Sequence, residues 1–308
     1  MNRRMTKPLT GVLGLLAAMT LGACGKEPPK PLGNTPLDNP PHATQKEGSA
    51  GIRVARVAKA GPEILADSAE FQGAKQVAVN LIPQMVAMPF NQTAGISSVR
   101  VRGIHDGTWV SLRIEWDDAT ANTVPGLDQF EDMVAIQLPV NPGSTPNPMM
   151  GDPYNPVVIL QWRAGRQATL DKGELPTVKH AYPNTYSDVD IATLVGGEAG
   201  NAYRGAASLG NPRALADLDA SPIIAHKAKG YGTLTAYPGR HVEGKGTHDG
   251  SKWVAVFHIK LTGSEPLVPA LQPGADTVIS FAAWEGSRKE TGGRKAWAPT
   301  WTSLSLAP

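Results

Sequence analysis

Few side chains of this 308-residue sequence are spaced in a way that supports chemistry. The sequence contains no Gly-x-Ser-x-Gly motif, no His-Glu-x-x-His motif and no glycine-rich phosphate loop, and its seven histidines lack the spacing of metal ligands. Two carboxylate pairs, Asp117-Asp118 and Glu131-Asp132, consist of sequence neighbours, whose side chains diverge on a strand or turn. We expect both pairs to be solvated turn residues, so the sequence offers no nucleophile or acid–base arrangement for a hydrolytic enzyme.

Residues 1–23 have the features of a bacterial signal peptide. Three basic residues precede an apolar stretch over residues 9–21. That stretch is shorter than the roughly 20 residues that a membrane-spanning helix needs, and it fits a signal peptide. It ends in Leu21-Gly22-Ala23-Cys24, which resembles the lipobox of bacterial lipoproteins. In those proteins the peptide is cut before the cysteine, which carries the lipid.

Cys24 is the single cysteine, so the mature domain has neither a disulfide nor a Cys-x-x-Cys-His site for covalent haem attachment. Residues 24–50 are rich in proline and polar residues, which predicts an extended tether ahead of a folded domain over residues 51–308. We expect a lipid-anchored protein on the periplasmic side of a bacterial membrane. In Gram-negative lipoproteins an Asp directly after the lipidated cysteine favours retention in the inner membrane. Residue 25 is Gly in this chain, which favours the outer membrane.

The charge balance excludes nucleic acid as a partner class. The formal net charge of the whole chain is +2, and loss of Arg3, Arg4 and Lys7 with the signal peptide turns it into −1. The sequence has no arginine run or basic patch that could follow a phosphate backbone.

Short alternating or apolar runs, bounded by turn residues, dominate the chain after residue 50. The 33 glycines and 27 prolines fit many turns, and an antiparallel β-sandwich is the architecture that we expect. Residues 191–195 and 213–218 are the only helical patterns, and the region of about 165–230 is expected to form long loops over one end of the sandwich. The expected strands are 76–82, 108–116, 134–140, 157–162, 252–261, 277–284 and 301–306.

Two parts of the sequence contain the same short motif. His105-Asp106-Gly107 and His248-Asp249-Gly250 each precede an alternating run, and Asp-Gly in that position is a hairpin-turn signal. The two histidines could be metal ligands, but we interpret them as turn residues.

Three segments of the chain together carry a family resemblance. Residues 105–120 contain His-Asp-Gly and then Leu-Arg-Ile-Glu-Trp-Asp-Asp-Ala-Thr; residues 130–162 contain Phe-Glu-Asp-Met-Val-Ala-Ile-Gln-Leu-Pro and Pro-Met-Met-Gly; residues 279–301 contain Ile-Ser-Phe-Ala-Ala-Trp-Glu-Gly and Gly-Arg-Lys-Ala. This ordered set resembles the haem b-binding γ subunits of ethylbenzene dehydrogenase, dimethylsulfide dehydrogenase, selenate reductase and chlorate reductase. The resemblance covers residue 55 to the C-terminus and implies a β-sandwich with long loops that form a haem pocket.

In that family haem b is held without covalent bonds, by the methionine of a Met-Gly pair and the lysine of a Gly-Arg-Lys stretch. The matching positions are Met150 and Lys295, which the resemblance implies as the axial ligands of the iron, with Met149 as the rival methionine. A methionine is otherwise usually core filler and a lysine is usually solvated, so the residues alone would not identify either ligand.

This ligand pair implies electron transfer rather than catalysis. A thioether favours ferrous iron and raises the reduction potential, and a lysine amine coordinates only after its pKa has been depressed from about 10.4. With both axial positions filled, the iron has no open site for a substrate. The resemblance therefore implies a relay of single electrons between a molybdenum and iron–sulfur oxidoreductase, with its molybdopterin catalytic subunit and iron–sulfur subunit, and a soluble cytochrome. The lipobox and tether depart from the family, whose γ subunits are mostly soluble, and this leaves the partner open.

The alternative function is a lipid-anchored ligand- or carbohydrate-binding β-sandwich without haem. The seven tryptophans are compatible with sugar stacking, although Trp116, Trp162, Trp284 and Trp301 fall in family positions and are expected in the core.

The lipobox generates a first prediction, that the mature protein partitions into detergent and that Cys24→Ser abolishes this partitioning. The physical reason is that several acyl chains give stable membrane attachment, whereas the tether offers no apolar surface. Membrane fractionation of both forms after a high-salt wash measures the effect. A Cys24→Ser protein that stays with the membranes would place the anchor elsewhere.

Overall fold

The structure is a computed structural model that describes residues 51–124, 128–173, 221–237, 242–261 and 267–308. The expected signal peptide, the tether and both short helical patterns lie outside these residues. No helix in the described ranges is long and apolar enough to cross a membrane.

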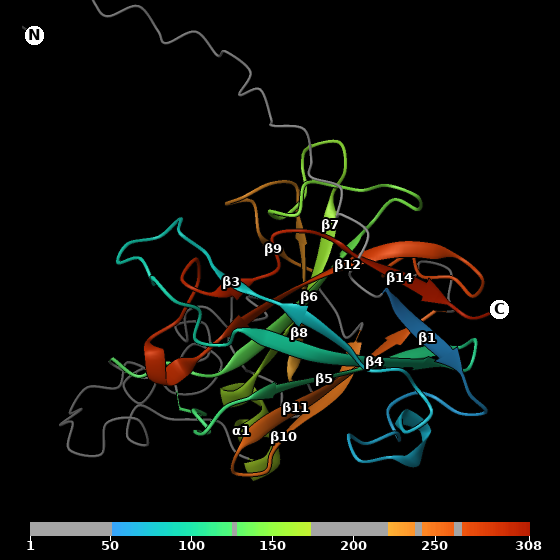
Figure 1. The fold of residues 1–308 in the computed structure, drawn as a ribbon, viewed down its shortest axis with the longest axis horizontal. Coiled ribbons are helices and arrows are strands. Elements are labelled where there is room, and N and C mark those ends of the chain that lie inside the picture. The colour runs from blue at the N-terminus through green and yellow to red at the C-terminus, as the bar shows by residue number, and fades with distance from the viewer. Residues whose placement is uncertain (1–50, 125–127, 174–220, 238–241, 262–266) are drawn as a thin grey trace, which may run out of the picture. The chain divides into compact units, whose positions relative to one another are not determined.

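Eleven of the described strands follow one hydrogen-bonded path, in the order β10-β11-β5-β4-β1-β14-β12-β6-β7-β8-β9, and β2, β3 and β13 pair beside it (Figure 1). One layer contains β10 (Val242–His248), β11 (Lys252–Lys260), β5 (Trp109–Asp117), β4 (Ser98–His105) and β2 (Val77–Asn80). The other contains β12 (Asp276–Trp284), β6 (Met133–Pro139), β7 (Val157–Arg163), β8 (Ile223–Ala228), β9 (Thr235–Ala236), β13 (Ala296–Trp297) and β3 (Ile82–Pro83). The strands β1 (Ile52–Arg56) and β14 (Thr302–Leu306) join the two layers.

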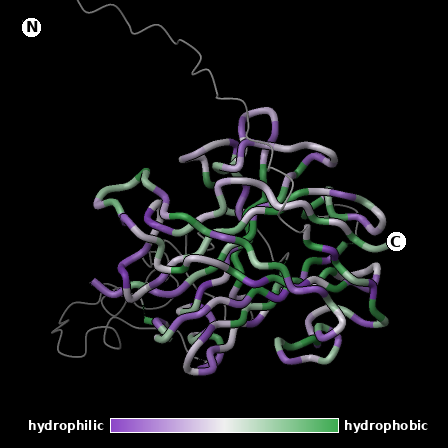
Figure 2. The backbone as a smooth tube through the Cα atoms, in the orientation of Figure 1, coloured by the Kyte–Doolittle hydropathy of each residue, from purple (hydrophilic) through white to green (hydrophobic). Residues whose placement is uncertain are grey.

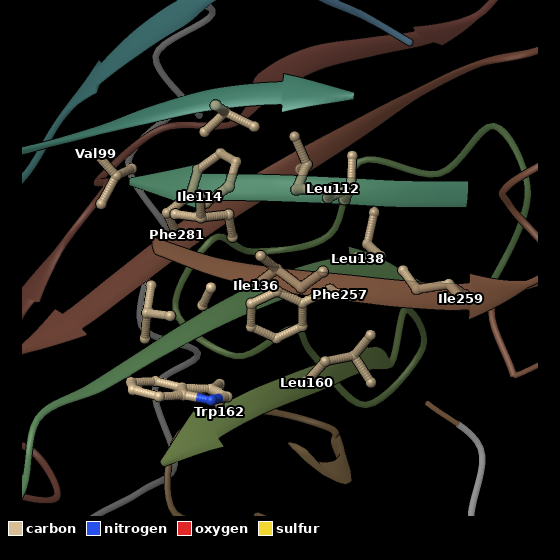
Figure 3. Packing of buried hydrophobic residues seen from close by; sticks show 14 of the residues in the cluster. Val99, Leu112, Ile114, Ile136, Leu138, Leu160, Trp162, Phe257, Ile259 and Phe281 are labelled. Carbon is tan, nitrogen blue, oxygen red and sulfur yellow. The ribbon is translucent and has the colours of Figure 1, made fainter. Parts of the chain in front are cut away.

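The core lies between the layers because alternate residues of facing strands point inward (Figure 3). Leu112 and Ile114 of β5 belong to the same buried cluster as Ile136 of β6, Leu160 of β7 and Phe281 of β12. Burial of each such side chain contributes roughly 1.5–3 kcal/mol. Hydrophobic residues accordingly follow the strands that cross the middle of the molecule (Figure 2).

Glycines in β10 allow the layers to close beside a group of indole rings. The Trp162 ring lies 5.9 Å from Trp116 and 5.0 Å from Trp253, between ring centroids. A Cβ atom at Gly246 would come within 2.1 Å of Trp162, and one at Gly244 within 2.2 Å of Ile223. Only glycine permits this approach of β10 to the second layer.

The mainly β expectation is confirmed, and all seven expected strand regions contain strands. The sheet is mixed rather than wholly antiparallel, because β1 pairs in parallel with β14 through Ile52–Leu304 and with β4 through Ala55–Ile104. These partners are far from β1 in sequence, so local alternation carries no information about their direction.

The Asp-Gly hairpins are confirmed. Asp106-Gly107 connects β4 to β5 and Asp249-Gly250 connects β10 to β11, with both glycines at positive φ. The interpretation of His105 as a turn residue is wrong, because it is fully buried as the last residue of β4. His248 ends β10, and its Nε2 lies 2.9 Å from the carbonyl oxygen of Asp118.

The expectation of long loops over 165–230 is also wrong for its described parts. Helix α1 (Ala164–Lys172) begins this region and ends at Gly173, which has the left-handed conformation typical of a helix terminus. Strand β8 then extends the second layer by pairing with β7. Both elements have short or weakly periodic sequences, so they depend on packing against β7 and β10.

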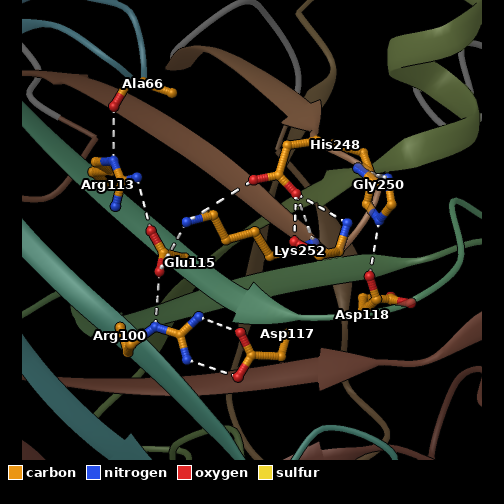
Figure 4. A network of polar contacts seen from close by, with 11 residues as sticks. Ala66, Arg100, Arg113, Glu115, Asp117, Asp118, His248, Gly250 and Lys252 are labelled. Atoms are coloured by element: carbon orange, nitrogen blue, oxygen red, sulfur yellow. Dashed lines mark hydrogen bonds and ion pairs between the residues drawn. The ribbon is translucent and has the colours of Figure 1, made fainter.

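Three of the four paired carboxylates are buried, which corrects the expectation of solvated turns. Asp117 is exposed and pairs with Arg100 at 2.6 Å (Figure 4). In contrast, Asp118, Glu131 and Asp132 are at most 4% exposed. Glu131 pairs with Arg163 and accepts a bond from the Gly165 amide. Hydrogen-bond donors therefore offset the cost of burying the Glu131 carboxylate. The sequence pattern does not reveal this burial.

Asp132 connects three segments through its carboxylate. Its Oδ2 accepts bonds from the Asn122 amide at 2.7 Å and the Trp253 indole at 3.0 Å, and its Oδ1 accepts from the Gly286 amide at 2.8 Å. Burial raises the pKa of Asp132 to about 7, although the backbone donors of Gly286 and Asn122 act in the opposite direction.

The second prediction is that Asp132→Ala destabilises the fold by about 3 kcal/mol, because three buried donors lose their acceptor. The measurement is the free energy of unfolding in denaturant. The matched control is Asp117→Ala, which removes an exposed ion pair and should cost less than about 1 kcal/mol. Equal effects of the two substitutions would contradict the role of Asp132.

Candidate functional site

Two adjoining cavities lie on the face of β12, β6 and β7 that points away from the core. The larger has a volume of about 420 Å³ and the smaller about 40 Å³. Both are bordered by Met150, Ile159, Trp284 and Lys295. The size of the larger cavity is in the range of small-molecule and cofactor sites.

The larger cavity is lined by both apolar and polar side chains. Its apolar side chains come from the outward positions of the strands, such as Met133 of β6 and Ile159 of β7, and from Leu234 before β9. The polar side chains of Glu131, Gln161, Arg163 and His226 border it as well. A ligand with both apolar and polar parts suits this mixed lining.

A strained loop places Met150 at this cavity. Met150 has φ 67° and the following Gly151 has φ 76°, and a non-glycine residue in this region is uncommon and costs free energy. The loop is fixed by bonds from the Gly151 amide to the Asn147 carbonyl at 2.9 Å and from the Gly230 amide to the Met150 carbonyl at 2.8 Å. Strain that the surroundings enforce so firmly is typical of functional positions.

The Lys295 segment is held by contacts other than those that fix the Met150 loop. Lys295 immediately precedes β13, which pairs with β12. The loop before it is anchored by the fully buried Glu290, whose carboxylate accepts bonds from the backbone amides of Glu285 at 3.0 Å and Gly95 at 3.1 Å. The side chain of Lys295 is therefore presented by a fixed backbone.

The amine of Lys295 has unusual electrostatic surroundings. Its Nζ lies 5.0 Å from the centroid of the Trp284 ring, and no hydrogen bond or ion pair joins it to another described residue. Burial alone lowers the pKa of Lys295 to about 8. A larger fraction of the amine is thus neutral near pH 7 than in an ordinary lysine, and the neutral form is the one that binds metals.

The structure brings Met150 and Lys295 together although 145 positions separate them in sequence. Met149 borders only the smaller cavity, and its amide donates to Asn147 Oδ1 at 2.8 Å. The site lies on the face of a sheet, not at one end of the sandwich where loops were expected. His105 and His248, the other candidate metal ligands, border neither cavity.

Sequence reasoning missed the wall residues on β6 and β12, although one signal could have found them. β6 reads Met-Val-Ala-Ile-Gln-Leu-Pro, and every residue of it is buried. A strand with apolar residues on both faces must be covered on both, so its sequence indicates a second buried surface outside the core.

The residues present fit a haem. A cavity with mixed apolar and polar lining is bordered by a soft thioether and by a half-buried lysine whose pKa is lowered. These two side chains are of the kind that can complete the coordination of haem iron as neutral ligands.

Comparisons with known proteins agree with this chemistry. A family model described as ethylbenzene dehydrogenase matches residues 68–296. The chain is 26% identical over 214 residues to the chlorate reductase subunit gamma of Ideonella dechloratans, covering 69% of this chain and 66% of that protein. It is 24% identical over 222 residues to a Haloferax mediterranei protein that carries the name respiratory nitrate reductase heme subunit ORF7. This match covers 72% of this chain and 60% of that protein. The chain thus spans less than two thirds of the length of these relatives.

Solved structures of low similarity were also found. One is a carbohydrate-binding protein from Bacteroides uniformis, with 9% identity and a TM-score of 0.42 over 84% of this chain and 100% of that one. Another is a family 9 carbohydrate-binding module from Caldicellulosiruptor kristjanssonii in complex with cellotriose, with 10% identity and a TM-score of 0.39. It covers 83% of this chain and 93% of that one. The family match covers well over half of the sequence and includes both Met150 and Lys295, so the chain belongs to the ethylbenzene dehydrogenase family.

Proposed function

We propose that this chain is a haem b-binding electron-transfer subunit in which Met150 and Lys295 are the axial ligands of the iron. The observation that carries the proposal is the Lys295 amine, which borders the same cavities as Met150 and has no ion pair or hydrogen bond with a described residue. Desolvation disfavours the charged ammonium, and coordination uses the neutral amine that desolvation favours.

The chain's own residues position and insulate the cofactor. The strained backbone at Met150 and the Glu290 anchor before Lys295 fix the two ligands independently. Trp284, Met133 and Ile159 supply apolar contact surface for the cofactor. A bound haem would exchange single electrons, and with both axial ligands supplied by protein it would leave no position for a substrate.

The names of the two relatives support a subunit of an oxidoreductase complex, since they refer to a reductase gamma subunit and a reductase heme subunit. The partners that we propose are a molybdopterin catalytic subunit and an iron–sulfur subunit, or a soluble cytochrome. The lipobox ending in Cys24 supports a lipid anchor on the periplasmic side of the membrane, with the outer membrane favoured.

The alternative carbohydrate-binding function receives less support. Sugar-binding surfaces stack rings on accessible aromatic faces, and all seven tryptophans of this chain are buried or half-buried. Trp284 borders the cavity, and its indole nitrogen is bonded to the Gly292 carbonyl oxygen at 3.1 Å.

The third prediction concerns the ligands singly. Lys295→Ala should open one coordination position and give a high-spin spectrum and carbon monoxide binding by the ferrous form. Met150→Ala should do likewise and lower the reduction potential, because the soft ligand that favours ferrous iron is lost. Visible spectroscopy and redox titration of the full chain reconstituted with haem b measure both effects.

The matched control is Met149→Ala, which changes the neighbouring methionine and should leave the spectrum low-spin. A large spectral change in that control would transfer the ligand role to Met149. Wild-type protein that takes up no haem on reconstitution would favour the carbohydrate-binding alternative.

The fourth prediction concerns the pH dependence of haem uptake. Coordination requires the neutral amine, so below the Lys295 pKa of about 8 each pH unit should reduce lysine-dependent affinity about tenfold. Affinity should therefore rise from pH 6 to about 8 and then level off. Haem titrations of the apoprotein test this, and the slope should be lost in Lys295→Ala.

A further inference from the structure

A glutamine faces the proposed lysine ligand across a short β-ladder. β3 and β13 pair through Pro83–Ala296 and Ile82–Trp297, so the next antiparallel pair is Gln84 with Lys295. The Gln84 amide donates to the Lys295 carbonyl oxygen at 2.8 Å, which confirms this continuation of the register. Directly opposite residues project to the same face with Cβ atoms about 5 Å apart. Both side chains accordingly border the smaller cavity.

The side chain of Gln84 has an unused acceptor. Gln84 is 3% exposed, and its Oε1 is buried without a hydrogen-bond donor among the residues that the structure describes. Buried side-chain oxygens nearly always have a partner, so an acceptor of this kind at a cavity indicates a donor that arrives with the ligand.

Lysine coordination creates such a donor. A neutral amine that directs its lone pair at iron keeps two N–H groups, and each of them can donate a hydrogen bond. Lys295 itself has no acceptor among the described residues before haem is bound. The Gln84 carbonyl oxygen is the unsatisfied acceptor on the same face of the ladder.

We propose that Gln84 is a positioning residue for the axial amine: its Oε1 accepts a hydrogen bond from Lys295 Nζ and orients the lone pair towards the haem iron. This inference rests on the proposed function, because it presupposes coordination by Lys295. Hydrogen bonds to a metal-bound group hold its orientation and strengthen its donation, and their loss commonly weakens the ligand 10–100-fold.

The readout is the acid-induced detachment of lysine, followed as the low-spin to high-spin transition of ferric haem in the full chain. Only the amine of the two ligands takes up a proton on release, so the transition reports on Lys295. Gln84→Leu should retain haem, and a ligand weakened about tenfold should move the transition midpoint up by about one pH unit. Gln84→Asn, which keeps a polar amide but is shorter by one methylene, should shift it in the same direction.

Ile82→Ala is the matched control for disturbance of the ladder. Ile82 is on the same strand, is 45% exposed and borders neither cavity, so its substitution should leave the midpoint unchanged. An equal shift in this control would assign the effect to strand pairing and overturn the role of Gln84. If Gln84→Leu does not fold, the transition midpoint of Gln84→Asn is compared with that of the Ile82→Ala control instead.

Lysine coordination and the positioning role of Gln84 are contradicted by different results. Wild-type midpoints in both Gln84 variants, together with loss of the transition in Lys295→Ala, would overturn the positioning role and leave the proposed function intact. A transition that persists in Lys295→Ala would overturn lysine coordination, and the Gln84 inference with it.

Discussion

Burial of β6 on both faces is the constraint on which the rest of this structure depends. Its inward residues, such as Ile136, pack against the opposite layer, while its outward residues, such as Met133 and Ala135, line a second apolar cluster with Trp284. A sheet covered on one face would leave that second cluster in water. The loops that carry Met150 and Lys295 cover it instead, so the cavity is a consequence of how the sandwich is completed.

The carboxylates of Asp132 and Glu131 differ from the amine of Lys295 in their hydrogen-bond partners. Asp132 and Glu131 are surrounded by donors, which include backbone amides and, for Glu131, the guanidinium of Arg163. These carboxylates connect segments and act as structural acceptors. Lys295 has no ion pair or hydrogen bond with a described residue; its Nζ lies over the Trp284 ring, and burial lowers its pKa. A lysine with a lowered pKa at a cavity is a candidate functional residue.

The fold fixes the backbone of both proposed ligands. Met150 is placed by two consecutive residues at positive φ, and Lys295 by the start of a two-residue strand that pairs with β12 and β3. Both side chains border the larger cavity, where Met150 also packs against a buried cluster with Trp301 and Lys295 lies over Trp284. The fold also brings Gln84 opposite Lys295, so one short ladder sets the positions of the proposed ligand and of the acceptor that we propose for it.

The sequence by itself determined the strand regions, the two Asp-Gly hairpins and the family, because alternation, turn chemistry and ordered motifs are local properties. It also nominated Met150 and Lys295, through resemblance rather than through spacing. Only the tertiary structure decided the parallel pairing of β1, the burial of Asp118 and Asp132, and the position of the site on a sheet face. These features arise from contacts between residues far apart in the chain, whose energies have no signature in any local stretch of sequence.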